Sequence, residues 1–552
     1  MTSAPPTPRP AALGGRPPRT TREARHRAAG RTAPLFLRTT WVRWMPLAFV
    51  VLGALARLRQ WAGGRSLWLD EVLIADNLVH RGFGELATKP LAHYQVAPLL
   101  WVELEHLSVT LFGSGERALR LLPLLAGLAS LGLFWVLARR LLPDVLVPVA
   151  VLVVALHPAL IYYSNEVKQY STDVLVILAL ALLAQNVAGR ADDGPALRRL
   201  TLAGVLAVWF SHVAVLGLAG ISVVLVVRPV LSRDVKRAAR VALVLSPWVL
   251  AWIASYVVAL HSVQSSTELS NYWRHTYPHS VLGLPGWFVG RWYDVAGNPG
   301  RLTVRALALL LLAVGLLRLG FLGRRQAAIA WAAVPMALLA AAVHAYPFAD
   351  RLALWVVPLL ALALAATLPH RLEPWALTWL LIGSALLTVV VGPAVGTGLK
   401  RTVQVQEVEE LKPLLQRLAT QRQLSDIVLV EIGSEGPFDY YSRRVGVSRD
   451  GVLLFASRGG TGPCNDLPAL QTGRFLTDRV WVVSSHRLVA KQRLGTLEDM
   501  LGRIRTVTHE VRHLHDTSAD AYLFDPAIGP SDKTDTVPKN PERCLSVVRS
   551  TR

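Results

Sequence analysis

The chain has 552 residues, of which 52% are hydrophobic and only 17% are charged. This composition excludes a string of ordinary soluble domains and is typical of a protein embedded in a membrane. The formal net charge of +21 would favour a nucleic-acid partner in a soluble protein. Here the basic residues stand in short clusters between apolar runs, so we interpret the charge as membrane topology and expect no nucleic acid.

The first 44 residues form a basic tail with nine arginines and one glutamate and no apolar periodicity. We expect this tail (1–44) to be disordered and cytoplasmic, touching at most anionic lipid headgroups. The first apolar run follows at 45–62. It contains Ala54-Leu55-Ala56, so a cleaved signal peptide is an alternative, but the tail is long for one and favours an uncleaved anchor.

Eleven apolar runs are candidate membrane spans. They lie near 45–62, 118–138, 145–163, 172–188, 200–213, 214–228, 239–260, 302–319, 327–343, 352–368 and 375–395. If the basic tail is inside, the positive-inside rule places the basic clusters in the inner connections. These clusters are Arg139-Arg140; Arg190, Arg198 and Arg199; Arg228, Arg233, Lys236, Arg237 and Arg240; Arg318, Arg324 and Arg325; and Arg371. We therefore predict a multi-span α-helical membrane domain over 45–395 with about 11 transmembrane helices. The Ala, Leu, Arg and Val-rich usage suggests a bacterial plasma membrane.

Two segments decide which side of the membrane each later loop faces. The fifth and sixth runs share a polar break at Ser211-His212, and we keep them as two spans because one long span would invert the rest. Residues 95–112 are also apolar, but Glu103, Glu105 and His106 make a full span expensive. We predict an interfacial helix there, on the outer surface.

Beyond residue 396 the chain becomes more polar. A helical period over 404–420, short β-branched runs at 426–432, 452–455 and 479–483, and a helix near 495–504 predict a small α/β domain over 396–552, outside the membrane by parity. The stretch with Pro530 and Pro538 is expected to be loop. Cys464 and Cys544 could form a disulfide outside the cytoplasm, the alternative being two buried thiols.

On this topology the unusual polar residues gather in the outer loops. The first outer loop, 63–117, begins with WLDEV (68–72) and holds two adjacent carboxylates. A partly buried carboxylate can take the proton from an attacking hydroxyl, and we assign Asp70 this general-base role. Glu71 points about 100° away on a helix, so it would bind a metal, a sugar hydroxyl or a neighbouring base. The competing interpretation is a helix start whose carboxylates complement the dipole.

Cations on the outer side would stabilise the negative charge of a lipid-phosphate leaving group. The candidates are Lys89, Lys168 and Arg351. Lys168 follows Glu166 and precedes Tyr170 in YYSNEVKQYS (162–171), where a solvated ion pair is an equal alternative. His212 could be functional or a structural hydrogen-bonding residue. A divalent cation is possible, with Asp70, Glu71 and His93 as candidate ligands, but their spacing matches no metal signature.

Five segments together carry a resemblance to a known superfamily. They are WLDEV, KPLAHYQVAPLLWVELEHLSVTLFGSGERALRLLPLLAG (89–127), HPALIYYSNEVKQYSTDVL (157–175), WFSHVAV (209–215) and YPFADRLALWVVP (346–358). Over roughly 40–395 the chain resembles the GT-C integral-membrane glycosyltransferases. It looks most like the branch of protein O-mannosyltransferases (family 39) and lipid A aminoarabinose transferases.

The resemblance implies transfer of a sugar from a polyprenyl-phosphate donor to an acceptor on the outer face, with inversion at the anomeric carbon. By position, Asp70 matches the catalytic acid of the first outer loop and Glu71 its usual neighbour. Lys89 matches a donor-phosphate contact, although Thr88-Lys89-Pro90-Leu91 departs from the common His-Pro-Pro-Leu and Glu-Lys-Pro-Pro forms. Glu166 and Lys168 match the acidic and basic pair of the second loop. The acceptor could be a glycan, a lipid or a protein, and no nucleotide-binding fingerprint is present.

Two other functions stay open on the sequence. A transporter or flippase of lipid-linked sugar would concentrate charge near the bilayer midplane in paired repeats, which we do not find. A lipid-linked-glycan polymerase or ligase would rely on a large outer loop, and 261–301 is a candidate. Radiolabelled donor followed into products would separate these classes.

Overall fold

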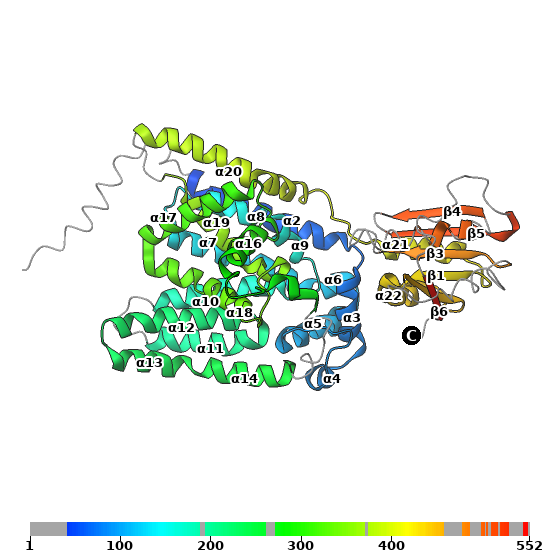
Figure 1. Ribbon diagram of the computed structural model, residues 1–552, viewed down its shortest axis with the longest axis horizontal. Helices are drawn as coiled ribbons and strands as arrows, with labels where there is room; N and C mark the ends of the chain where they lie inside the picture. The colour runs from blue at the N-terminus through cyan, green and yellow to red at the C-terminus, as the bar shows by residue number, and fades with distance from the viewer. Residues whose placement is uncertain are drawn as a thin grey trace, which may run out of the picture.

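The structure, a computed structural model, describes residues 41–187, 194–260, 271–369, 374–457, 477–485, 498, 500–502, 504–505, 509–516, 519–528 and 545–549. Within these residues the chain has two regions (Figure 1). Residues 41–400 are helical, and residues 411–549 hold a mixed sheet with helices α21 and α22. We call them the helical region and the sheet region. The basic tail before residue 41 and both cysteines, Cys464 and Cys544, lie outside the described residues.

The helical region opens with α2 (Trp41–Gly63), followed by a group of short helices. These are α3 (Leu69–His80), α4 (Phe83–Thr88), α5 (Leu99–Phe112) and α6 (Glu116–Leu119). The apolar segments follow as α7 (Leu121–Leu141), α8 (Val147–Ala155), α9 (Pro158–Tyr163), α10 (Tyr170–Val187), α11 (Gly194–Phe210), α12 (Ala214–Leu231), α13 (Val235–Leu245), α14 (Pro247–Leu260), α17 (Arg305–Trp331), α18 (Ala333–Ala342), α19 (Val357–Ala366) and α20 (Pro374–Lys400). The connections contain η2 (Arg274–Thr276), α16 (Leu284–Gly297) and η3 (Asp350–Val356). Each predicted apolar run contains helix, and α20 continues past residue 395, where the sequence places the end of the membrane domain.

A helical membrane protein is confirmed, whereas the count of about eleven spans stays a prediction. Among the described residues, six helical segments are long and apolar enough to cross a membrane, or seven if the bent pair Arg325–Trp331 and Ala333–Ala342 is one span. The other predicted runs form shorter or interrupted helices. The third run, for example, divides into α8 and α9 just before Pro158, because a proline lacks the amide that would continue the helix.

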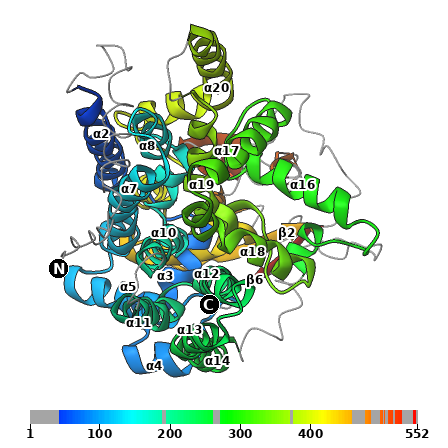
Figure 2. The same cartoon turned by 90° about the vertical axis from the view of Figure 1, so that its left-hand side faces the viewer.

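Helix α10 lies among the other helices when the molecule is viewed along its long axis (Figure 2). It packs closely against α7, α11 and α12, and most of its side chains are buried. The largest apolar cluster joins α7, α8, α10, α17 and α19. Close helix contacts depend on glycine: a Cβ at Gly398 of α20 would lie only 1.7 Å from the Leu156 carbonyl oxygen after α8.

The polar break at Ser211-His212 separates two helices, as the sequence predicts. Helix α11 ends at Phe210 and α12 begins at Ala214. A Cβ at Gly204 in α11 would lie 2.9 Å from a methyl carbon of Leu218 in α12. The chain therefore folds back on itself at the break.

The acidic first loop and the first pair of arginines lie at opposite ends of α7. Arg120 precedes the helix, whereas Arg140 near its end donates to the Leu182 carbonyl and to Asn186 Oδ1, both at 3.1 Å. A helix of 21 residues is about 30 Å long. The two charged groups are therefore separated by roughly the thickness of a bilayer core.

The sheet region contains a six-stranded sheet in the order β4-β5-β3-β1-β2-β6. Its elements are α21 (Leu411–Gln421), β1 (Ile427–Glu431), η4 (Ile432–Ser434), α22 (Glu435–Val445), β2 (Val452–Ser457), β3 (Val480–Ser484), β4 (His509–Asp516), β5 (Ala519–Asp525), η6 (Pro526–Ile528) and β6 (Leu545–Arg549). Strand β1 pairs in parallel with β2 and β3, and the other pairs are antiparallel. The predicted strands β1, β2 and β3 are present, whereas β4, β5 and β6 were not expected. The expected loop around Pro530 and Pro538 lies outside the described residues. Half of the expected helix near 495–504 is described, and those residues are helical.

The sheet region packs on the first loop of the helical region. Helix α22 contacts α3, and one apolar cluster includes Leu67, Val72, Trp101, Leu411 and Phe438 from both regions. Figure 1 shows α22 beside α3, with the sheet beyond it. The two carboxylates of the WLDEV segment therefore stand at the junction between the regions.

Candidate active site

The WLDEV segment places its two carboxylates in the first turn of α3, which begins at Leu69. Successive residues of a helix point about 100° apart, so the two side chains reach different partners. Asp70 meets Arg351, whereas Glu71 points inward and is fully buried. The pair therefore divides into a partly exposed and a buried carboxylate.

Glu71 is the centre of a buried ionic network. The Arg120 guanidinium donates to both of its oxygens, at 2.8 and 2.6 Å, Arg65 lies 3.7 Å away, and the Val167 amide donates to it at 3.0 Å. Burial acts to raise the pKa of Glu71, but the charges of Arg120 and Arg65 outweigh it and keep the pKa below its usual value. Glu71 thus ties the first loop to the second, and this arrangement favours a positioning role over substrate binding.

Asp70 forms an ion pair of 2.7 Å with Arg351, and each side chain is 22% exposed. Arg351 also lies over the Tyr170 ring, 5.9 Å from its centroid, an arrangement that stabilises a cation. The preceding Asp350 has a left-handed backbone, with φ of 45°, and accepts a hydrogen bond from Asn298 at 3.0 Å. This support fixes the loop that carries Arg351.

Glu166 and Lys168 lie next to this pair. Burial and the nearby Glu71 charge raise the pKa of Glu166 to about 7, and among the described residues neither of its oxygens has a hydrogen-bond partner. Burial lowers the pKa of Lys168 below its usual value, while the charge of Asp70 acts in the opposite direction. Lys168 Nζ donates to Gln95 Oε1 at 2.6 Å. The alternative of a solvated ion pair between Glu166 and Lys168 is therefore not supported, because both side chains are buried.

Lys89 lines a separate cavity of about 290 Å³ whose walls are Leu86, Ala87, Thr88, Pro90, Leu91, Gln95, Val96, Ala97, Leu99, Val102, Val257 and Val258. Its side chain is 61% exposed and pairs with Glu85 at 2.6 Å. Gln95 also belongs to this wall, so it connects the cavity to Lys168. The cavity combines apolar surface from α5 and α14 with a cation at its edge.

His93 supports the loop that carries Gln95. It has a left-handed backbone, with φ of 60°, its Nε2 lies 3.1 Å from Asp76 Oδ2, and its carbonyl accepts a hydrogen bond from Gln95 at 3.1 Å. His212 lies in the break between α11 and α12. Its neighbour Ser211 donates to Asp173 at 2.5 Å, and among the described residues no hydrogen bond or ion pair joins His212 to Asp70 or Arg351.

Several positioning residues were not expected from the sequence. Arg120 and Arg65 hold Glu71, and the signal for Arg120 was its place at the start of an apolar run, where an arginine is expensive unless paired. From the sheet region, Glu410 accepts from the Ser66 hydroxyl at 2.8 Å, and the Tyr441 hydroxyl accepts from the Leu67 amide at 2.6 Å and donates to Glu116 at 3.2 Å. No local pattern marks these long-range partners.

No family model and no curated protein sequence matches the chain. Solved structures do match: ArnT from Cupriavidus metallidurans bound to undecaprenyl phosphate has 14% identity, covers 89% of this chain and 99% of its own, and has a TM-score of 0.51. The chain therefore has a GT-C fold. Apo ArnT from the same organism has 15% identity, coverage of 90% and 100%, and a TM-score of 0.45. The archaeal oligosaccharyltransferase AglB from Archaeoglobus fulgidus, in complex with an inhibitory peptide and a dolichol-phosphate, has 11% identity, coverage of 91% and 76%, and a TM-score of 0.45.

The GT-C fold agrees with the superfamily that the sequence resembles. It places the outer-loop segments of that resemblance together, because Asp70, Glu166, Lys168, Tyr170 and Arg351 come from three separate parts of the chain and meet at one site. Lys89 and His93 are linked to this site through Gln95, and Glu71 is buried against Arg120 and Arg65.

Proposed function

We propose that this protein is an inverting glycosyltransferase that moves a sugar from a polyprenyl-phosphate donor to an acceptor hydroxyl on the outer face of a bacterial plasma membrane. The observation that carries the proposal is the ion pair of Asp70 with Arg351, close to Lys168, whose ammonium contacts Gln95 in the wall of the cavity that Lys89 lines. A carboxylate can accept the proton of a nucleophile, and the two cations can stabilise a phosphate leaving group. The similarity in fold to an ArnT that binds undecaprenyl phosphate supports the choice of donor.

The reaction is a displacement at the anomeric carbon. The acceptor hydroxyl attacks this carbon while Asp70 takes its proton, the bond from carbon to phosphate oxygen breaks, and the electron pair leaves with polyprenyl phosphate. Arg351 and Lys168 stabilise the added negative charge on that phosphate. Glu71 holds the first loop in place through Arg120, and Tyr170 supports Arg351.

The donor lipid would occupy the cavity between α5 and α14, with Lys89 and Gln95 beside its phosphate. His93 orients the loop of Gln95, and His212 is a further candidate for contact with the substrate. The topology of this proposal has the N-terminus in the cytoplasm, about eleven spans over 45–395 and the domain 396–552 outside. The Arg139-Arg140 pair at the end of α7 opposite the acidic first loop supports this sidedness.

The test uses the purified full chain in lipid vesicles with radiolabelled polyprenyl-phosphate sugars and wall, lipid and protein acceptor fractions. Wild-type protein should form a labelled glycosidic product, and Asp70→Asn should lose about 10²- to 10⁴-fold in rate, as expected for removal of a general base. The matched control is Asp294→Asn. Asp294 is a half-exposed aspartate of α16 that pairs with Arg291, outside the proposed site.

Three outcomes would contradict the proposal. Full activity of Asp70→Asn would remove Asp70 as the base. Movement of labelled donor across the vesicle membrane without glycosidic product would favour a transporter, whereas growth of a lipid-linked chain by repeated units would favour a polymerase. A reporter fused after residue 400 that is active in the cytoplasm would contradict the sidedness.

A further inference from the structure

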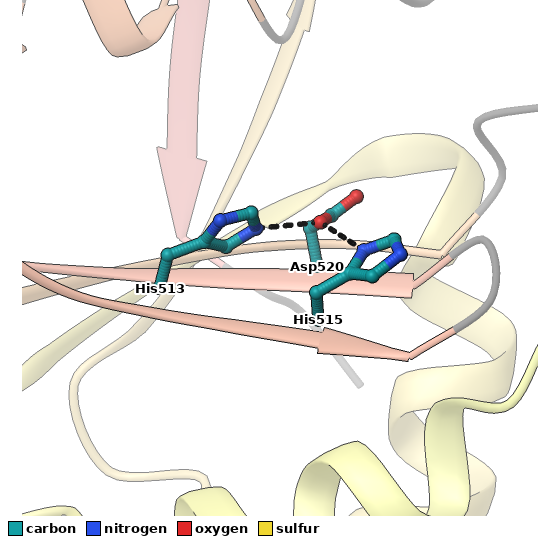
Figure 3. Close-up of side chains that lie close together, drawn as sticks. All are labelled: His513, His515 and Asp520. Carbon is teal, nitrogen blue, oxygen red and sulfur yellow. Dashed lines mark hydrogen bonds and ion pairs between the residues drawn. The ribbon is translucent and has the colours of Figure 1, made fainter.

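The edge of the sheet region carries a cluster of metal-ligating side chains that the proposed function does not use. His513 and His515 stand two residues apart on β4, the edge strand of the sheet. In the antiparallel register His515 is paired with Asp520 of β5, and His513 with Tyr522. Residues two apart on a strand share a face, so both imidazoles and the carboxylate project from one side of the sheet, as Figure 3 shows.

The cluster lies on the face of the sheet that is turned away from the helical region. Ala519, Ala521 and Leu523 of β5 belong to the apolar cluster that includes α21 and α22. The alternate residues Tyr522 and Phe524 pack with Met500 and Leu501 on the other face. Asp520 shares this second face because side chains alternate along a strand. The cluster is therefore distinct from the site around Asp70.

The three side chains converge on one point. His513 Nε2 lies 2.7 Å and His515 Nδ1 2.8 Å from the same oxygen, Oδ1 of Asp520 (Figure 3). One ligand atom from each residue lies within 4.8 Å of the others, and among the described residues this is the group of three or more potential ligands that could hold a metal ion. The Asp520 side chain is fully buried, and a buried carboxylate is stabilised by pairing with a cation or by coordinating a metal ion.

The surroundings leave room for an ion. The His513 ring stacks on the Tyr522 ring, with centroids 4.2 Å apart and planes 11° apart, so its orientation is fixed. The His513 and His515 side chains are 38% and 52% exposed, which leaves a solvent side for further ligands. In a tetrahedral zinc site with ligand bonds near 2.0 Å, neighbouring ligand atoms are roughly 3.3 Å apart. Each N···O separation must therefore open by about half an ångström.

We propose that His513, His515 and Asp520 bind one divalent transition-metal ion, preferentially Zn²⁺. Two imidazole nitrogens and one carboxylate oxygen form a ligand set for zinc and similar ions, whereas Ca²⁺ and Mg²⁺ take oxygen ligands. The ion takes the position between the two ring nitrogens and Asp520 Oδ1, and water completes its coordination. It joins edge strand β4 to β5 through side chains, in addition to the backbone ladder. The proposal does not depend on the proposed transferase activity.

The test measures Zn²⁺ binding to the full chain, purified in detergent with an affinity tag free of histidine and stripped with a chelator. Equilibrium dialysis against ZnCl₂ with elemental analysis should give one tightly bound ion per wild-type chain. His515→Gln and His513→Ala should each weaken this binding at least about tenfold, and Zn²⁺ should raise the Tm of the wild type more than that of either variant.

The control is His275→Ala, which alters an exposed histidine whose ring contacts the Tyr272 carbonyl. It should bind like wild type. Asp520→Asn removes the carboxylate at nearly constant volume, and circular dichroism checks that each variant is folded. Wild-type binding no tighter than that of the His513→Ala/His515→Gln double variant would overturn the proposal. The proposal would also be overturned if bound Co²⁺ gave the same visible absorption spectrum in the wild type and in the double variant.

Discussion

Asp70 Oδ2 lies 2.7 Å from Arg351 Nη1, so the first turn of η3 supplies the cation for the carboxylate that follows the first apolar run. The pair is only partly buried, and a donor phosphate can compete for the guanidinium. Arg351 therefore belongs to the site as much as Asp70 does. In the proposed reaction the state of the Asp70 carboxylate therefore depends on whether Arg351 contacts Asp70 or the donor phosphate.

Removing the Arg351 charge should slow transfer strongly. We expect Arg351→Gln to lower the turnover number by about 10²- to 10³-fold, as loss of a group that stabilises developing charge does in other enzymes. Arg351→Lys should recover only part of the rate, because an ammonium lacks the planar fork of a guanidinium. Steady-state kinetics with labelled donor measure both effects. Arg291→Gln on α16 is the control, and an unaffected rate in Arg351→Gln would exclude this role.

Neutralising Glu71 should destabilise the protein. Glu71→Gln removes the carboxylate that pairs with the buried Arg120, and loss of one member of a buried ion pair costs about 3–5 kcal/mol of unfolding free energy. Denaturation in mixed micelles measures this change. Glu85→Gln, which alters an exposed ion pair with Lys89, should change stability far less. Equal effects of the two substitutions would contradict the positioning role.

The ion pair between Glu71 and Arg120 also predicts a pH dependence of stability. The pKa of Glu71 is lower in the folded than in the unfolded protein, so its stabilising contribution is complete above the unfolded value of about 4.3. The contribution is lost as the pH falls below that value, through the folded pKa. The acid limb of a stability curve should therefore be shallower in Glu71→Gln than in wild type.

Glu166 should make donor binding depend on pH near neutrality. Because the pKa of Glu166 is raised to about 7, its carboxyl is neutral below pH 7 and leaves Lys168 and Arg351 available to the donor phosphate. Ionisation above pH 7 supplies a competing anion, so KM for the donor should rise there. Glu166→Gln should show a flat KM over pH 6–8, roughly one unit either side of that pKa. A wild-type-like profile in this variant would assign the transition to another group.

The contact between Tyr441 and the first loop should affect catalysis from outside the site. Tyr441→Phe removes the acceptor of the Leu67 amide and the donor to Glu116, which leaves buried polar groups unpaired at a cost of about 1–3 kcal/mol. We expect a lower turnover number and faster proteolysis of the loop before α3. Tyr440→Phe loses only a longer 3.3 Å bond to the Ser114 carbonyl and should have a smaller effect.

Two glycines of α20 give a matched test of helix packing. Gly398→Ala would place a methyl group 1.7 Å from the Leu156 carbonyl oxygen, whereas Gly396→Ala meets no atom within 4 Å. The first substitution should lower Tm, because backbone must move to admit the methyl group. The second should leave Tm unchanged or raise it slightly, since alanine favours a helix by up to about 1 kcal/mol. Equal Tm values would contradict the close contact.

The sequence predicted the elements whose signals are local. Apolar runs gave the helices, the polar break at Ser211 gave the turn between α11 and α12, and β-branched runs gave β1, β2 and β3. Strand β4 was missed because its sequence, HEVRHLHD, is polar and partly exposed at the sheet edge. Edge strands bury little apolar surface, so their pattern is weak.

The candidate site was predicted only in part, because contacts between distant residues leave no local signal in the sequence. Asp70, Glu166, Lys168 and Arg351 were selected because charged residues beside apolar runs are rare and expensive. Whether a carboxylate is buried depends on distant partners, and Arg120 for Glu71 or Gln95 for Lys168 can be found only once the helices are packed. The sequence therefore separated Asp70 from Glu71 by helix geometry but did not identify Arg120 and Arg65 as the partners of Glu71.

The contacts of Ser66 and Leu67 with Glu410 and Tyr441 also bear on the order of assembly. Ser66 and Leu67 of the first loop are synthesised 344 and 374 residues before Glu410 and Tyr441, the residues that bind them. Until the sheet region has been synthesised, the first loop lacks its contacts with Glu410 and Tyr441 and cannot adopt its final conformation. Reactivity would thus be withheld from unfinished chains.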